Sequence, residues 1–386
     1  MINNYELYNP TKLIFGEDRI KDITQYLPRE SKILFVYGQG SIKHNGIYQK
    51  VIDLLKGYDY VEFGGIEPNP KYENLMEAVK LGREYKIEFI LAVGGGSVVD
   101  GAKFISAAIP FDEDPWKLVS DKLDFNESIP LGTILTLPAT GSEMNKGAVI
   151  SNKSKGDKLA LISEKLFPKF SILDVSVLSS LPKRQIANGI IDAFVHTTEQ
   201  YITYPINAKL QDRFAESILI TLIEEGPQFY NNVENKEVGA NIMFSATMAL
   251  NGVIGAGVPT DWSIHMIGHE LTALYNIDHA RSLAIILPVL YRIKIEEKLS
   301  KLVQYAEIVW QITEGNDKEK AIKAIYLTEK FFQSLGVPTK LSDYDVDLEY
   351  TIKVIKEKFA YRNMLNFGEN GIISINDIDP ILRGAY

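Results

Sequence analysis

Cysteine is absent from the 386 residues of this chain. Its absence excludes disulfide bonds, thiolate zinc sites and thiol nucleophiles, and it agrees with a reducing cytosol as the setting. No apolar run approaches the roughly 20 residues that a bilayer-spanning helix needs. The first residues, MINNYELYNPTK, are polar and lack the apolar region of a signal peptide. We therefore expect a cytoplasmic protein without a membrane partner.

Positive charge is also in short supply. Lys and Arg number 41 against 50 Asp and Glu, which gives a net charge of -9, and no run of basic residues stands out. A nucleic-acid partner is therefore not expected. Hydrophobic residues make up 46% of the chain, which is ample for a large core. The length predicts two domains, or three.

Strand-like and helix-like segments alternate along the first half of the chain. Short apolar runs at 32–38, 60–66, 89–96 and 131–140 are typical of buried strands, and helices are expected at 49–57, 73–85 and 98–108. This alternation predicts a parallel sheet with helices on both faces. Ligands of such sheets bind at the carboxyl ends of the strands.

The pattern changes near the segment LSSLPKR, which ends at residue 184. From about Pro182 onward the apolar residues follow a helical period, and few strand candidates appear. We expect an α/β nucleotide-binding domain over residues 1–180 and an all-α domain over residues 181–386.

Three consecutive glycines, Gly94 to Gly96, stand between an expected strand and an expected helix in AVGGGSVVDGAK. Glycine lets backbone N–H groups approach a phosphate closely, and a helix N-terminus adds partial positive charge. We interpret this segment as a pyrophosphate-binding turn, with Ser97 as a hydroxyl donor or a helix cap. By itself the pattern indicates a phosphate and not specifically a dinucleotide.

A second turn, VYGQGSIK, favours NADP over NAD. In dinucleotide-binding folds a carboxylate near a strand end often holds the adenosine ribose, and none stands at this strand end. The turn instead offers donors and one cation for a 2'-phosphate, from Gly38, Gln39, Gly40, Ser41 and Lys43. Lys43 taken alone fits an ordinary solvated lysine equally well. A third loop, TLPATGSEMN, offers further hydroxyls, but such residues also simply form loops.

Histidine is scarce, yet three of the five histidines lie between Asp261 and Ala280. His265 and His269 are four residues apart on an expected helix, and TALYNID is expected to turn the chain back so that His279 joins them. Asp192 and His196 show the same spacing and share a helix face. Alone, that pair fits a helix ion pair, whereas the clustering of four histidines favours a metal site.

Imidazole and carboxylate together suit a divalent first-row metal such as Fe(II), Zn(II) or Mn(II). No Glu follows His265, so the HExxH pattern of metalloproteases is excluded. A nucleotide-binding domain combined with a His/Asp metal site indicates hydride transfer assisted by a Lewis acid.

GGGSVVDGAK, TLPATGSE, the Asp192/His196 pair and the HxxxH…H segment resemble the iron-containing (group III) alcohol dehydrogenases over nearly the whole chain. FGGIEPNP and NGVIGAGVPTDWSIHMIGHELTA resemble the branch of butanol dehydrogenases and NADPH-dependent aldehyde reductases. The resemblance implies a dehydroquinate-synthase-like fold, a homodimer and a small aliphatic aldehyde or alcohol substrate such as butanal. It also implies Fe(II) as the metal, with Zn(II) as the alternative.

The resemblance further implies roles for individual residues. The metal ligands would be Asp192, His196, His265 and His279, and His269 would orient the substrate or relay a proton near the nicotinamide. The cofactor would be held at its pyrophosphate by Gly95, Gly96 and Ser97, near its adenosine ribose by Asn69, and toward its nicotinamide by Thr136, Thr140, Ser142, Val149 and Lys158, with Asp100 beside them. The chain has GQGS where this branch often has GGGS, which leaves NAD(H) as an alternative to NADP(H).

Two other functions fit part of the pattern. Other dehydroquinate-synthase-like enzymes also use NAD and a metal, but they need basic residues to hold a charged substrate. Near the expected metal site only Arg281 is basic, which favours an uncharged substrate. A non-catalytic sensor would bind NADP without metal-dependent turnover.

The NADP interpretation can be tested at Ser41. Ser41→Asp should weaken NADPH binding more than NADH binding, because the new carboxylate repels a 2'-phosphate. Fluorescence titration with each cofactor measures the two affinities. Equal losses for both cofactors would mean that Ser41 does not face the 2'-phosphate.

Overall fold

A computed structural model describes all residues from Met1 to Tyr386. The chain forms two compact units. The helical unit consists of Met1–Leu7, Lys183–Asn231 and Met248–Tyr386, and the α/β unit consists of Tyr8–Pro182 and Asn232–Thr247. Unlike the expected domains, the helical unit includes Met1–Leu7 and the α/β unit includes Asn232–Thr247. The functional division at residue 180 therefore stays a prediction.

The α/β unit is built on a six-stranded sheet in which every neighbouring pair of strands is parallel. The strand order is β1-β8-β5-β4-β2-β3. The strands are β1 (Lys12–Gly16), β2 (Ile33–Gly38), β3 (Tyr60–Ile66), β4 (Phe89–Gly95), β5 (Leu131–Leu137) and β8 (Phe170–Asp174). Residues of β2, β4 and β5 are almost all buried, which explains their continuous apolar runs. The expected parallel α/β architecture is confirmed.

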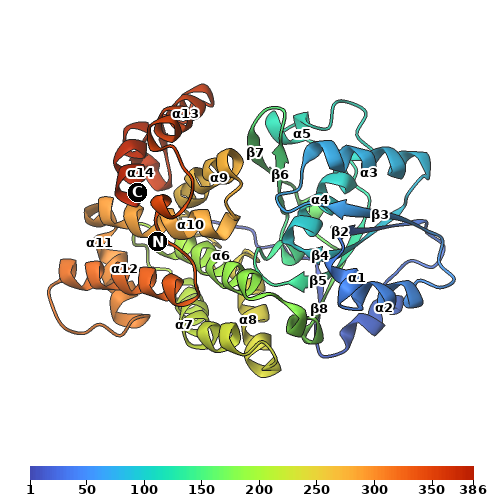
Figure 1. Cartoon of the computed structure of the whole chain (residues 1–386), viewed down its shortest axis with the longest axis horizontal. Helices are drawn as coiled ribbons and strands as arrows, with labels where there is room; N and C mark the ends of the chain where they lie inside the picture. Colours follow the sequence, from blue (N-terminus) through green and yellow to red (C-terminus); the bar gives the residue numbers. More distant parts are fainter. The chain divides into compact units, whose positions relative to one another are not determined.

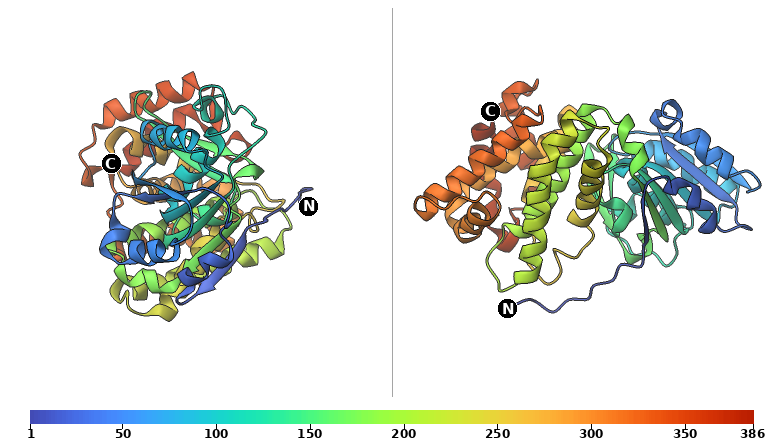
Figure 2. Two further views of the ribbon diagram at one scale, coloured as in Figure 1. Left: turned by 90° about the vertical axis from the view of Figure 1, so that its right-hand side faces the viewer. Right: turned by 90° about the horizontal axis from the view of Figure 1, so that it is seen from below.

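Helices lie on both sides of this sheet (Figures 1 and 2). They are α1 (Ser41–His44), α2 (Ile47–Leu54), α3 (Tyr72–Glu84), α4 (Gly96–Ala108) and α5 (Lys117–Ser120). Figure 1 shows α3 and α4 on one side of the sheet and α1 and α2 on the other. Leu34 of β2 and Ile90 of β4 share one core with α3 and α4. The next residue of each strand, Phe35 and Leu91, is also fully buried, so both faces of the sheet are covered.

Four strands of the α/β unit were not expected from the sequence. Besides β1 and β8 at one end of the sheet, β6 (Gly147–Asn152) and β7 (Asp157–Ile162) form an antiparallel hairpin. In β6 buried and partly exposed residues alternate strictly, which marks a strand covered on one face only. For β6 this period of two was the missed signal, because the expected strands are continuous apolar runs.

The second unit is helical, as expected. It contains α6 (Lys183–Tyr201), α7 (Lys209–Asn231), α9 (Ser263–Tyr275), α10 (His279–Ile293), α11 (Ile295–Ile308), α12 (Asp317–Ser334), α13 (Leu348–Tyr361) and α14 (Ile378–Ala385), and a short ladder of β9 (Asn366–Phe367) with β10 (Ile373–Ser374). The chain leaves the helical unit after Asn231 and re-enters it within α8 (Lys236–Ala249), whose residues up to Thr247 belong to the α/β unit. Helix α6 packs against α7 and α10, and its residues from Gly189 to Tyr201 are all buried.

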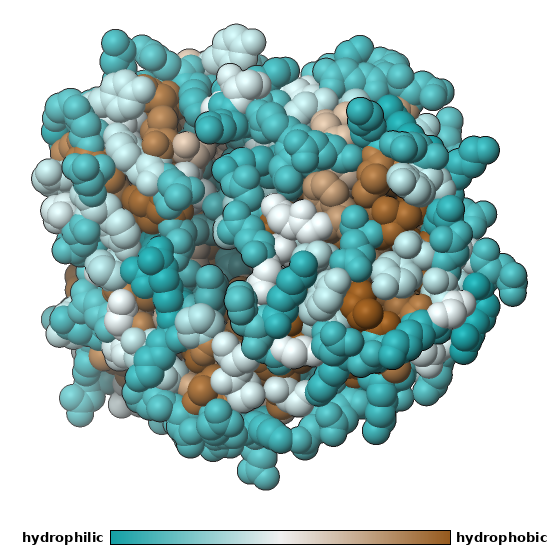
Figure 3. Space-filling view, turned by 45° about the vertical axis from the view of Figure 1, so that its right-hand side comes forward, coloured by the Kyte–Doolittle hydropathy of each residue, from teal (hydrophilic) through white to brown (hydrophobic).

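The surface drawn in Figure 3 is mainly hydrophilic, and its hydrophobic residues form separate patches. Among the helices, none has both the length and the apolar character required to cross a membrane.

Close packing at Gly132 of β5 provides a test of the sheet. A methyl group built at Gly132 would lie 2.3 Å from the ring of Phe170 in the neighbouring strand β8. Gly132→Ala should therefore lower the free energy of unfolding by about 1–3 kcal/mol, as overpacking does. Denaturant unfolding measures the change. Gly147→Ala is the control, because its added methyl group meets no atom closer than 3.6 Å; an equal loss in both variants would contradict the packing argument.

Candidate active site

Helix α6 carries three polar side chains on one buried face. Asp192, His196 and Glu199 are four and three residues apart, so they follow one stripe along the helix. All three are buried, with Glu199 completely so. Polar groups in such surroundings are costly unless they are paired, and this stripe therefore requires partners from other helices.

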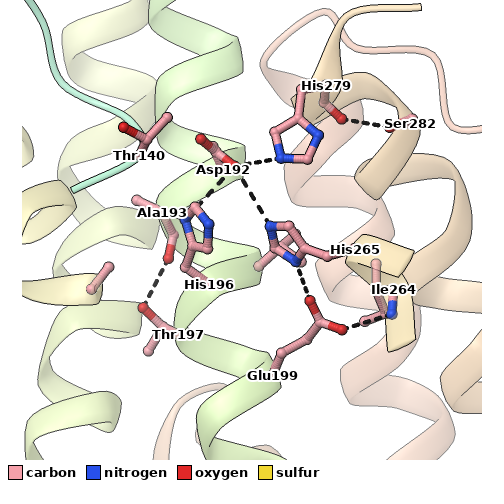
Figure 4. A network of polar contacts seen from close by, with 12 residues as sticks. Thr140, Asp192, Ala193, His196, Thr197, Glu199, Ile264, His265, His279 and Ser282 are labelled. Carbon is pink, nitrogen blue, oxygen red and sulfur yellow. Dashed lines mark hydrogen bonds and ion pairs between the residues drawn. The ribbon is translucent and has the colours of Figure 1, made fainter. Parts of the chain in front are cut away.

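Two further helices supply these partners (Figure 4). His265 lies in the first turn of α9, and His279 is the first residue of α10. Between the two helices Asn276 has a φ of 55°, the left-handed conformation that ends α9. One ligand atom each from Asp192, His265 and His279 can be chosen so that all three lie within 4.8 Å of one another.

Distances around Asp192 fit ligands of a shared ion better than direct hydrogen bonds. Its Oδ1 lies 3.7 Å from Nδ1 of His196, 4.0 Å from Nε2 of His265 and 3.7 Å from Nε2 of His279. These separations are too long for hydrogen bonds. Two ligands that each lie about 2.0–2.2 Å from one ion can be separated by at most roughly 4.4 Å. The buried Oδ1 receives no hydrogen bond from the protein, so the donor set fits a divalent cation.

His269 adjoins this cluster, although it is not among the three residues whose ligand atoms converge. Its ring centroid lies 5.0 Å from that of His279 and 6.0 Å from that of His265. Trp262 covers the cluster at another point, with its ring edge-on to His265 at 5.5 Å. Trp262 has a φ of 66°, an uncommon conformation for a bulky residue, and this conformation turns the chain into α9.

Glu199 was not identified from the sequence, although it contacts the cluster directly. Its Oε2 pairs with Nδ1 of His265, and its Oε1 accepts a hydrogen bond from the backbone N–H of Ile264 at 2.7 Å. Complete burial raises the pKa of Glu199 well above its usual range, and the nearby Asp261 carboxylate adds to the increase. The available signal was its place three residues beyond His196 on the face that also carries Asp192.

The glycine-rich turns of the α/β unit lie together at one edge of its sheet. Gly38 ends β2 and Gly95 ends β4, and these strands are parallel neighbours, as are β4 and β5. From β2 the chain proceeds to β3 on one side, whereas β4 lies on the other side. Such a reversal of strand order is the usual ligand site in open parallel sheets. The turns after β2, β4 and β5 therefore surround the expected nucleotide position.

At the β4–α4 turn the backbone of Gly96 lies so close to the Thr140 side chain that no space is left for a Cβ atom. A Cβ atom on Gly96 would lie 2.3 Å from Oγ1 of Thr140. Ser97 accepts a hydrogen bond from the backbone N–H of Asn69 at 3.3 Å, and Lys158 donates to the Asn69 side chain at 2.9 Å. Five of the expected cofactor residues thus share one neighbourhood, together with Gly95.

Other expected cofactor residues are held by protein groups. Asp100 accepts hydrogen bonds from Ser142 Oγ at 2.6 Å and from the Val149 N–H at 3.0 Å, so both of its oxygens are engaged. Lys103, which the sequence reading did not single out, donates to the carbonyl oxygens of Ser142, Asn145 and Gly147. Burial lowers the pKa of Lys103 to about 8. Asp100 and Lys103 thereby hold the loop after β5 in place.

The turn after β2 places its lysine over two aromatic rings. Lys43 Nζ lies 5.0 Å from the ring of Tyr37 and 4.8 Å from that of Tyr48. The contact with Tyr37 is the main reason that the pKa of Lys43 is raised. No carboxylate stands at the end of β2, but Glu62 of β3 is close by and accepts hydrogen bonds from both tyrosine hydroxyls. Gln39 and Ser41 are exposed beside this group.

Comparison with known proteins identifies the family. Residues 10–175 match the model of the iron-containing alcohol dehydrogenases, and residues 186–386 match the C-terminal model of the same family. The chain belongs to this family. It is 53% identical to the NADPH-dependent aldehyde reductase YqhD of Escherichia coli, with 100% of each chain covered. The solved structure of that protein superposes with a TM-score of 0.98, covering 100% of this chain and 99% of the other.

A second family member with a solved structure is the NADH-dependent butanol dehydrogenase A of Thermotoga maritima. It is 33% identical over 100% of this chain and 99% of its own, with a TM-score of 0.95. These findings confirm the expected family, its aldehyde reductase and butanol dehydrogenase branch, the fold class and the assignment as an oxidoreductase. The roles of the individual site residues stay predictions of this article.

Removal of one imidazole tests the ligand assignment. His265→Ala should lose bound metal and activity together, because one of three converging donors is gone, while the α/β unit keeps its affinity for NADPH. Metal content measured by mass spectrometry and cofactor fluorescence report the two properties separately. His44→Ala, which removes an exposed histidine on α1, is the control and should retain its metal. An active variant at position 265 without metal would refute the assignment.

Proposed function

We propose that this iron-containing alcohol dehydrogenase family member reduces small aliphatic aldehydes, with butanal as a representative substrate, and that it uses NADPH and a divalent metal. The convergence of Asp192, His265 and His279 is the observation that carries the proposal. A buried carboxylate oxygen that receives no hydrogen bond, Oδ1 of Asp192, lies in the midst of imidazole nitrogens and is suited to bind a cation.

In this proposal Asp192, His196, His265 and His279 hold Fe(II), with Zn(II) as the alternative. When bound, the ion supplies Lewis acidity toward a carbonyl oxygen and NADPH supplies the hydride. His269 lies next to His279, with the two ring centroids 5.0 Å apart. It is therefore suited to donate the proton that the product hydroxyl requires, as imidazole does near neutral pH. The ring of Trp262 limits the access of water to His196 and His265.

The charges on the helices of the site favour an uncharged substrate. Arg184 and Arg281 both approach the carboxylate of Asp278. Lys358 and Arg362 of α13 both contact Glu270 of α9, the residue that follows His269. Because these cations already face carboxylates, they are poorly suited to hold a phosphate or carboxylate group of a substrate. An aldehyde or alcohol needs no such partner.

For the cofactor we propose NADP(H) in preference to NAD(H). Gly38, Gln39, Gly40, Ser41 and Lys43 would face the 2'-phosphate, and the carboxylate of Glu62 is already occupied by two tyrosine hydroxyls. Asn69, Gly95, Gly96 and Ser97 would hold the ribose and pyrophosphate, with Thr136, Thr140, Ser142, Val149 and Lys158 toward the nicotinamide. Asp100 would contribute by ordering Ser142 and Val149. The 53% identical relative from Escherichia coli is an NADPH-dependent aldehyde reductase, which supports this choice.

Four further properties belong to the proposal. Residues 1–180 would act as the cofactor-binding domain and residues 181–386 as the metal-binding domain. The protein would be cytoplasmic and would act as a homodimer, without nucleic-acid or membrane partners. The absence of cysteine supports the cytoplasmic location, and the net charge of -9 supports the absence of a nucleic-acid partner.

Metal dependence of turnover tests the proposal. Protein stripped with a chelator should oxidise NADPH with butanal only after Fe(II) or Zn(II) is restored, and the loss of NADPH absorbance measures the rate. The ion that restores the higher rate identifies the working metal. Turnover that needs no metal would refute the proposed site. Absence of turnover with every pairing of metal and cofactor, despite NADPH binding, would favour the NADP sensor or another dehydroquinate-synthase-like activity.

A further inference from the structure

We infer that Glu199 is the positioning residue of the metal site: one carboxylate both caps helix α9 and holds the ring of His265 in the orientation that metal binding requires. The inference rests on the proposed metal site. It adds a residue that is not a ligand, and it makes the affinity for the ion depend on a contact between α6 and α9.

Both oxygens of Glu199 are engaged on consecutive residues of α9. Oε1 accepts the N–H of Ile264 at 2.7 Å, and Oε2 contacts Nδ1 of His265 (Figure 4). Helix α9 begins at Ser263, and its N-cap residue Trp262 provides no side-chain cap. The first N–H groups of a helix need acceptors, and here a carboxylate from another helix supplies one.

The contact at Nδ1 determines which ring nitrogen is available. When Nδ1–H donates to a carboxylate, the lone pair of a neutral imidazole resides on Nε2. In His265 it is Nε2 that faces Asp192 Oδ1, at 4.0 Å. Glu199 therefore fixes both the tautomer and the direction of the ring, and it does so from the same helix that carries Asp192 and His196.

A network of buried charges holds Glu199 and the start of α9 in register. The N–H of Asp261 donates to the backbone carbonyl of Glu199 at 2.9 Å, and the Asp261 carboxylate accepts the N–H of Ser263 at 3.0 Å. Lys298 of α11 is buried and lies 2.6 Å from Asp261 and 2.5 Å from Glu369. The segment that leads into α9 is thus fixed by both backbone and side-chain contacts. The Ile264 N–H and the His265 ring are therefore held in place for Glu199.

Glu199→Gln tests the inference with a side chain of nearly the same shape. Two N–H groups face the carboxylate, whereas a carboxamide offers one acceptor oxygen and one NH2 group, so one donor is left opposed by another donor. We expect the affinity for Zn(II) or Co(II), measured by competition with a chromophoric chelator, to fall about 10- to 100-fold. The visible spectrum of the Co(II) form should change, because the His265 nitrogen no longer points at the ion.

Glu216→Gln is the matched control. Glu216 is also a buried glutamate of the helical unit, and it accepts a hydrogen bond from Tyr201 without contacting a histidine. Its substitution should leave the metal affinity and the Co(II) spectrum as they are in the wild type. The affinity for NADPH, measured on all variants, reports on the integrity of the α/β unit.

A double-mutant cycle with His265→Ala separates positioning from a general effect on folding. If Glu199 acts through His265, Glu199→Gln should change the residual, much weakened metal affinity of the His265→Ala protein, measured at raised metal concentration, less than about twofold. An equal loss in both backgrounds, or an unchanged affinity in the single variant, would overturn the inference. Should glutamine prevent folding, Glu199→Asp, which is too short to reach both partners, should show the same loss. Failure of the wild type to bind metal would instead refute the proposed function.

Discussion

A buried carboxylate among imidazole rings is the constraint on which the helical unit depends. Asp192 lies on the buried face of α6, where an isolated carboxylate would be costly. The carboxylates of Glu199, Asp261 and Glu369 are buried nearby, and Lys298 is the ammonium that pairs with two of them. Oδ1 of Asp192 receives no hydrogen bond, which favours a bound cation at the place where the histidine nitrogens converge. An ion bound there would tie together the three helices that carry these groups, α6, α9 and α10.

Buried charge also organises the α/β unit, but there the partners lie within the chain. Asp100 and Lys103 are neighbours on α4, directly after the glycine turn, and both reach the loop that follows β5. The residues of the motif GGGSVVDGAK consequently have two different roles. Its glycines allow close approach of the backbone, as Gly96 shows against Thr140, and its charged residues hold the neighbouring loop in position. Substitutions of either kind disturb the same turn for different reasons.

Much of the fold was predictable because its strands are buried on both faces. The runs that became β2, β4 and β5 are continuous and apolar, and a helix follows β2 and β4. Among the strands that were missed, β1 lies at the edge of the sheet and β6 is covered on one face, whereas β8 is fully buried but only five residues long. The candidate metal residues were found because histidine is rare in this chain and recurs at helical spacing. Glu199 was missed because a glutamate on a helix is common, and only its partner at His265 sets it apart.

The sequence by itself determined the chemistry that is available and its local spacing. It specified a glycine turn before a helix, a histidine-poor chain with four histidines in two segments, and family motifs over nearly its whole length. Only the tertiary structure decided which of these groups meet. Asp192 and His279 are far apart in the chain, and their distance of 3.7 Å results from the packing of α6 against α10. Likewise Asp100 became a support for the loop after β5 rather than an open ligand, because its neighbours consume both of its oxygens. Spacing along a helix follows from backbone geometry, whereas contacts between helices depend on the packing of the complete core.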